Sequence, residues 1–79
     1  MLRRISRFNE AEILYKDSLA ILHKINDKKG LAQVYMNYGI LKKDMNEFNK
    51  SSELLNKALE YERIPFYQQK IMDILREIR

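Results

Sequence analysis

Seventy-nine residues form at most one domain with a modest core. The absence of cysteine excludes disulfides and thiolate metal sites, and a single histidine, His23, excludes a cluster of histidine ligands. A formal charge of +4 is only a mild bias towards acidic partners. No apolar run approaches the roughly 18 residues of a membrane span. We therefore expect a cytoplasmic protein without membrane, cofactor or metal, in which nucleic-acid binding is unlikely.

The first half of the chain predicts two helices. Apolar residues at three- and four-residue steps indicate the first helix at about 7–26, with Ser6 as its N-cap. Turn-forming residues follow, and the same apolar spacing resumes over about 28–44. Asp27 is placed to cap this second helix.

The second half repeats this organisation. A third helix is predicted at about 47–62, with Asn46 as its N-cap, and a fourth at about 65–79. Pro65 suits the first turn of the fourth helix. Short connections make neighbouring helices antiparallel. The predicted fold class is all-α, with helix hairpins and no strand.

The apolar pattern also repeats at a spacing of about 40 residues, which is within the range of helical repeat proteins. The repeated pairs are Phe8 and Phe48, Leu14 and Leu54, Leu19 and Leu59, Leu31 and Ile71, Val34 and Ile74, Tyr35 and Leu75, and Tyr38 and Ile78. A period shared by both helix types indicates a short α-solenoid over 1–79. The helices are out of phase with whole repeats, so we expect a fragment of a longer array or a unit that another chain completes.

Short motifs within this repeat resemble the tetratricopeptide family. The motifs are Tyr35-x-x-Tyr38-Gly39 in the first helix type, and Ala11-x-x-x-Tyr15 and Ser51-x-x-x-Leu55 in the second type. The resemblance covers roughly the whole chain, in the variety with a period near 40. The sequence departs from the family where Lys42 replaces a preferred tyrosine and Leu55 replaces an aromatic residue.

A core and a close helix contact follow from the pattern. The residues predicted to be largely buried are Leu14, Leu19, Tyr35, Tyr38, Leu55 and Leu59. Gly39 costs about 1 kcal/mol relative to alanine inside a helix. We therefore expect a neighbouring helix to approach closely there, although simple tolerance of glycine is the alternative.

The resemblance implies a non-enzymatic scaffold that binds a protein or peptide on its concave face. The candidate residues are Gln33, Met36, Asn37, Ile40 and Lys43 on the second helix, and Asp73, Arg76 and Glu77 on the fourth. Asn37 matches the asparagine with which family members hold a peptide backbone, and a carboxamide both donates and accepts. The alternatives are that Met36 and Ile40 pack against the fourth helix or a second subunit, and that Asn37 is an ordinary surface residue.

Self-association is the competing hypothesis. The candidate residues for a homodimer are Ile13, Ala20, Tyr67 and Met72, which we expect on the outer faces of the first and fourth helices. Exchange of a terminal helix is one route to such a dimer. A weak basic patch for phosphates is offered by Arg3, Arg4 and Arg7 together with Lys42 and Lys43. A solvated surface is the simpler interpretation. Glu47 and the other carboxylates are likewise expected to be solvated.

Overall fold

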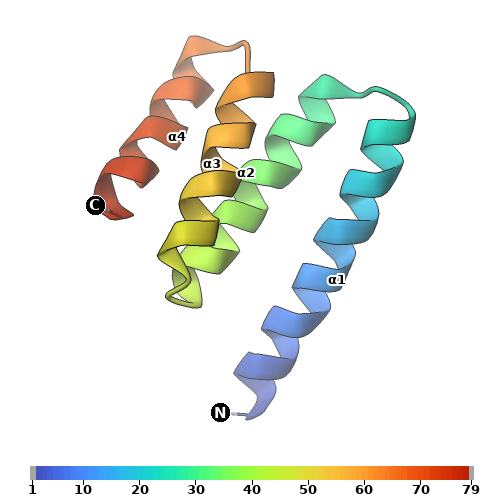
Figure 1. Ribbon diagram of the computed structural model, residues 1–79, viewed down its shortest axis with the longest axis vertical. Coiled ribbons are helices and arrows are strands. Elements are labelled where there is room, and N and C mark those ends of the chain that lie inside the picture. The colour runs from blue at the N-terminus through green and yellow to red at the C-terminus, as the bar shows by residue number, and fades with distance from the viewer. Residues whose placement is uncertain (1, 79) are drawn as a thin grey trace.

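The computed structural model describes the backbone of residues 2–78 and the side chains of residues 7–78, and this part contains four helices and no strand. The helices are α1 (Leu2–Lys24), α2 (Lys28–Asp44), α3 (Phe48–Tyr61) and α4 (Pro65–Ile78). Successive helices run antiparallel, and α2 contacts the other three (Figure 1). The predicted all-α class is confirmed. Stacking as a tetratricopeptide-like solenoid stays a prediction.

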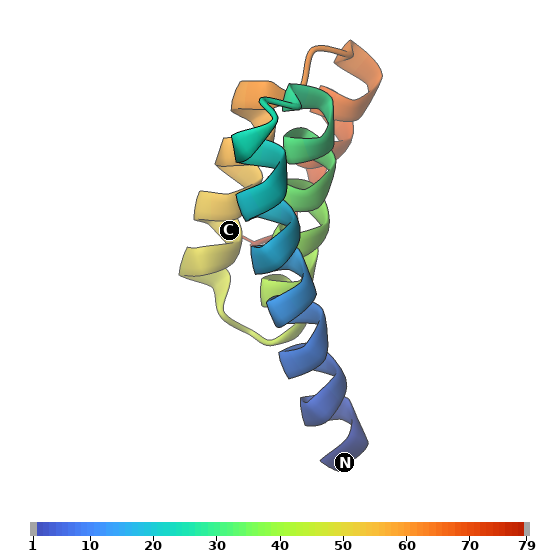
Figure 2. The same ribbon diagram turned by 90° about the vertical axis from the view of Figure 1, so that its right-hand side faces the viewer.

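The first helix differs from its predicted bounds, whereas the others agree within one residue. It begins at Leu2, five residues before the predicted start, so Ser6 lies inside the helix and does not cap it. It also ends two residues earlier, at Lys24. No proline or glycine precedes Gly30, so nothing in the sequence stops the helix from extending towards the N-terminus. Its first turns project beyond the other helices (Figure 2). Arg79, the predicted end of the fourth helix, lies outside the described residues.

The turns on either side of α2 share one geometry. Asn26 and Asn46 both adopt the left-handed conformation, with φ of 59° and 63°. In each turn the next residue donates its N–H to the carbonyl five residues earlier, at 2.9 Å. This is the hydrogen bond of a Schellman helix terminus, in which asparagine tolerates positive φ. The same type of turn therefore reverses the chain at both ends of α2.

The helix caps agree with the predictions at α2 but not at α3. Asp27 caps α2 by accepting a 3.0 Å hydrogen bond from the N–H of Gly30. Asn46 was predicted to cap α3, and this is wrong because its left-handed backbone closes α2 instead. Glu47 occupies the N-cap position of α3 and makes no side-chain capping bond.

The core lies between α2 and α3 and is completed by one residue of α4. The buried apolar residues are Leu31, Ala32, Tyr35, Tyr38, Leu55, Ala58 and Ile71. Of the predicted core, Tyr35, Tyr38 and Leu55 are thus confirmed, and Leu19 and Leu59 are half-buried at its edge.

Leu14 was also predicted to be buried, and this is wrong, since it is 65% exposed. The helix α1 packs on α2 through neighbouring positions such as Tyr15, whose ring stacks on Tyr38 at 5.6 Å. Because successive residues are about 100° apart around a helix, Leu14 lies on the flank of α1 beside that contact.

The predicted close approach at Gly39 is confirmed. A Cβ atom placed on Gly39 would lie 2.7 Å from Cγ of Leu55, which is fully buried on α3. Beside this contact, the buried hydroxyl of Ser51 donates a 2.7 Å hydrogen bond to the Gly39 carbonyl oxygen. The absence of a side chain at Gly39 therefore sets the distance between α2 and α3.

Candidate functional site

The predicted concave face of α2 is partly open. Gln33 and Asn37 are exposed, whereas Met36, Ile40 and Lys43 are half-buried. Met36 packs against the edge of the core cluster. It therefore contributes to packing within the chain and still reaches the surface.

A hollow of about 120 Å³ lies where the start of α2, the α3–α4 turn and the start of α4 meet. Its lining residues are Lys29, Gln33, Met36, Glu62, Ile64 and Tyr67. The structure thus brings two predicted partner-binding residues, Gln33 and Met36, together with Tyr67, which was predicted for self-association. The hollow has room for several water molecules or one small side chain.

Three residues that line the hollow, Lys29, Glu62 and Ile64, were missed from the sequence. They lie in or near turns, and no periodic signal assigns turn residues to a shared site. The turn is held in place by Glu62, whose carboxylate accepts 3.2 Å hydrogen bonds from the N–H groups of Arg63 and Ile64. Gln68 also donates a 2.7 Å bond to the Glu62 carbonyl. These bonds fix the turn that forms one wall of the hollow.

Further along α2 and α4, predicted partner-binding residues bind each other. The Lys43 ammonium lies 2.5 Å from a carboxylate oxygen of Glu77. Asp73 accepts a 3.0 Å hydrogen bond from Gln69 of its own helix, and Arg76 is exposed. Exposed ion pairs contribute little to stability, so Lys43 and Glu77 can exchange this contact for a partner at low cost.

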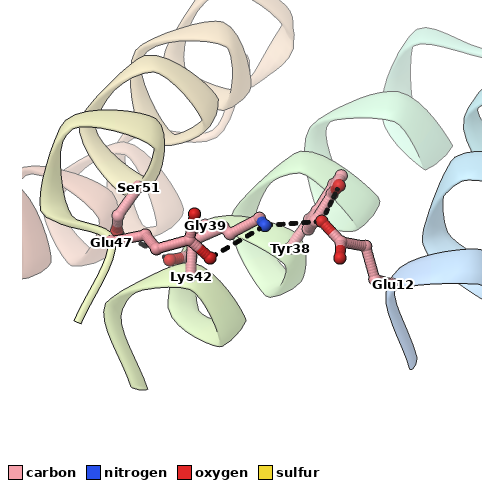
Figure 3. Close-up of polar contacts among 6 residues, drawn as sticks. All are labelled: Glu12, Tyr38, Gly39, Lys42, Glu47 and Ser51. Atoms are coloured by element: carbon pink, nitrogen blue, oxygen red, sulfur yellow. Dashed lines mark hydrogen bonds and ion pairs between the residues drawn. The ribbon is translucent and has the colours of Figure 1, made fainter. Parts of the chain in front are cut away.

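The most buried charge in the described side chains is Lys42, which is only 4% exposed. Its ammonium lies 2.5 Å from an oxygen of Glu12 and 3.1 Å from one of Glu47 (Figure 3). Tyr38 donates a 2.7 Å hydrogen bond to the same oxygen of Glu12. The network therefore joins α1, α2 and the residue before α3.

This network corrects two predictions. Lys42 belongs to no basic surface patch, because its charge is buried and paired. Glu47 is not a purely solvated charge, because it forms one of the two ion pairs of Lys42. The sequence did single out Lys42, as a departure from the tetratricopeptide pattern that the chain resembles. No signal pointed to Glu12, which lies on a different helix, far from Lys42 along the chain.

The hydrogen bonds of the network shift its ionisation. Bonds from Lys42 and then Tyr38 lower the pKa of Glu12 below its ordinary value. Burial, and then the bond to Glu12, raises the pKa of Tyr38. Burial alone lowers the pKa of Lys42, but its bonds to Glu12 and Glu47 outweigh this and raise the pKa. Glu12 and Lys42 are therefore both held in their charged forms.

The single histidine is engaged in a contact between α1 and the aromatic core. A 3.0 Å hydrogen bond joins Nε2 of His23 to the hydroxyl of Tyr35. The Tyr35 ring in turn stacks on Tyr61, at 5.9 Å between centroids. Because this arrangement fixes the end of α1 against α2 and α3, we assign His23 a packing role.

The residues predicted for self-association are all exposed but lie on separate surfaces. Ile13 and Ala20 are exposed on α1, and Tyr67 and Met72 are exposed on α4. Three further large apolar residues of α1 and its last turn, namely Leu14, Ile21 and Ile25, are equally exposed and were missed. They belong to a different side of α1 from Ile13.

No protein-family model, curated protein or solved structure matches this chain. The tetratricopeptide assignment accordingly stays a prediction. Within residues 2–78, no helix has the length and apolar character needed to cross a membrane. In the same part of the chain, no group of three or more potential ligands is arranged to hold a metal ion.

Proposed function

We propose that this chain is a non-enzymatic binding module that holds a segment of another protein along α2 and α4. The observation that carries the proposal is the hollow between α2, the α3–α4 turn and α4. Met36, Ile64 and Tyr67 offer apolar contact there, and Lys29 and Glu62 place one charge of each sign beside it. This combination suits one apolar side chain flanked by polar groups.

The backbone of the bound segment would follow α2 from this anchor. Gln33 and Asn37 are exposed and one turn apart, so they lie on the same face of the helix. Each carboxamide can donate to and accept from a peptide unit. Lys43 and Glu77 lie further along α2 and α4 and would meet charged groups of the ligand after giving up their mutual contact. A cytoplasmic location accords with the lack of cysteine.

The proposal is tested by selecting short linear peptides from a phage-displayed library against the 79-residue chain. Binding of a selected peptide would be measured by fluorescence anisotropy, and its footprint by amide chemical shifts. We expect shifts around the hollow and along the exposed face of α2. Asn37→Ala should weaken binding about fivefold, which corresponds to about 1 kcal/mol for one hydrogen bond. Tyr67→Ala should weaken it at least as much.

Asn56→Ala is the matched control, because Asn56 is an exposed asparagine on α3, away from the hollow. It should leave the affinity unchanged. A peptide that binds equally well to the Asn37→Ala and Tyr67→Ala variants would place the site elsewhere. Failure to select any peptide would count against a peptide-binding function.

A further inference from the structure

One flank of α1 carries an uncovered apolar stripe. We define the α1 stripe as Leu14, Ser18, Ile21 and Ile25, which follow one another at steps of four, three and four residues. Such steps place side chains on one face of a helix, and Ile25 continues the helix by donating its N–H to the carbonyl of Ile21. The three large members are 65%, 61% and 63% exposed in chain order. Aligned exposed residues of this size often mark an interface.

The internal repeat indicates which helix covers the equivalent face of α3. The α3 counterparts of Leu14, Ser18 and Ile21 are Leu54, Ala58 and Tyr61. Ala58 is fully buried, and Leu54 and Tyr61 pack half-buried against the core. On α3 this face meets α2, so α2 occupies the place that is open on α1.

Small residues occupy two equivalent positions on α3 and α1. On α3, Ser51 and Ala58 are both fully buried against α2, and Ser51 bonds directly to the α2 backbone. On α1 their counterparts are Ala11 and Ser18. Small side chains permit close approach of a facing helix. Thus α1 carries apolar and small residues at the same positions as those with which α3 packs on α2.

The helix that corresponds to α2 in the repeat is α4. The counterpart of Ala32, which is buried at 1% exposure, is Met72, which is 41% exposed. The counterpart of Tyr35 is Leu75, which is half-buried. We define the α4 flank as Gln68, Met72 and Leu75, which share one face at steps of four and three residues. Of the α2 counterparts of this flank, Tyr35 stacks on Tyr61 of α3 and Ala32 is buried, whereas Lys28, the counterpart of Gln68, is exposed.

We propose that the α4 flank of one copy packs antiparallel on the α1 stripe of a second copy. The template is the contact between α2 and α3, where Gly39 meets Leu55. Moving each α2 position forward by one repeat period gives a position on α4, and moving each α3 position back by one period gives a position on α1. The same pairing then places Met72 opposite Ile21 of the second copy, and Leu75 opposite Ser18. Because each copy keeps a free stripe at one end and a free flank at the other, association is head-to-tail and continues beyond a dimer.

The test is the molar mass of the 79-residue chain by light scattering and sedimentation up to high micromolar concentration. The mass should rise above the 9.6 kDa of one chain and pass through the dimer without a plateau. Ile21→Glu blocks the stripe and Met72→Glu blocks the flank, so each variant alone should remain monomeric. An equimolar mixture should form a one-to-one dimer at twice 9.6 kDa, because one intact stripe and one intact flank remain.

The control is Ile13→Glu, which changes a residue that is equally exposed on α1 but lies off the stripe. It should associate like the unaltered chain, and circular dichroism should show native helicity in every variant. A chain that stays monomeric throughout would overturn the proposal. So would a dimer plateau abolished by Ile21→Glu but not by Met72→Glu, which would indicate a symmetric α1 contact. A mixture that stays monomeric would also overturn it. These measurements need no peptide, so they are independent of the proposed binding function.

Discussion

The hydroxyl of Ser51 on α3 donates a hydrogen bond to the carbonyl oxygen of Gly39, a residue in the interior of α2. A helix carbonyl has a second lone pair, and a side chain reaches it only where the facing helix is close. The missing Cβ of Gly39 permits that approach, and Leu55 fills the remaining space. The central contact of the molecule is therefore a hydrogen bond and a steric fit at the same position.

Replacing Gly39 by alanine should destabilise the protein. On an exposed helix this change stabilises by about 1 kcal/mol. Here the new Cβ would lie 2.7 Å from Cγ of the fully buried Leu55. We expect a net loss of about 1–3 kcal/mol in the free energy of unfolding, measured with urea. In a Leu55→Ala background the same change should cost much less, because the clash is relieved. An equal loss in both backgrounds would show that overpacking is not the cause.

Replacing Glu12 by alanine should lower the free energy of unfolding more than substitutions on a surface helix usually do. The change leaves buried Lys42 with Glu47 alone and removes the hydrogen-bond acceptor of Tyr38. Loss of one partner of a buried charge network is expensive, and we expect a loss of about 2 kcal/mol in unfolding free energy. Glu10→Ala is the matched control, since Glu10 is exposed on the same helix. Similar losses for the two variants would contradict a stabilising role for the network.

Stability should fall in acid through the same carboxylate. Hydrogen bonds from Lys42 and Tyr38 lower the pKa of Glu12 from its ordinary 4.5, so the folded state binds its proton less readily than the unfolded state. This contribution is complete above pH of about 4.5 and is lost as the pH falls through the folded pKa. Urea midpoints between neutral and acidic pH should show the loss. Glu12→Gln should make the acid limb shallower, and an unchanged slope would assign acid sensitivity to other groups.

The left-handed turn at Asn46 should distinguish glycine from a β-branched residue. Its φ of 63° suits glycine and asparagine and opposes valine. Asn46→Gly should change stability by only a few tenths of a kcal/mol, and Asn46→Val should cost about 1–2 kcal/mol in thermal or urea unfolding. Asn49→Val in α3 is the control without positive φ. Equal effects of valine at positions 46 and 49 would show that backbone strain at the turn is not the cause.

Local pattern was sufficient to predict the helices and the closest helix contact. Apolar spacing predicted α2, α3 and α4 within a residue, and an interior glycine indicated the approach of α3 at Gly39. The start of α1 was misplaced, because no breaker marked it and Ser6 fits both a cap and a helix interior. Asn46 was misassigned for a similar reason, since asparagine favours both N-caps and left-handed turns.

The sequence by itself determined the all-α class, the antiparallel order and the internal repeat. The class follows from side-chain periodicity, the order from short connections between helices, and the repeat from recurrence of the apolar pattern along the chain. Only the tertiary structure decided that Leu14 faces outward, that Lys42 is buried between Glu12 and Glu47, and that Ile64 and Glu62 share a hollow with Met36. Periodicity gives the angle of a residue around its own helix. Which side of a helix is covered, and which distant charged residue lies against it, depends on how the helices pack.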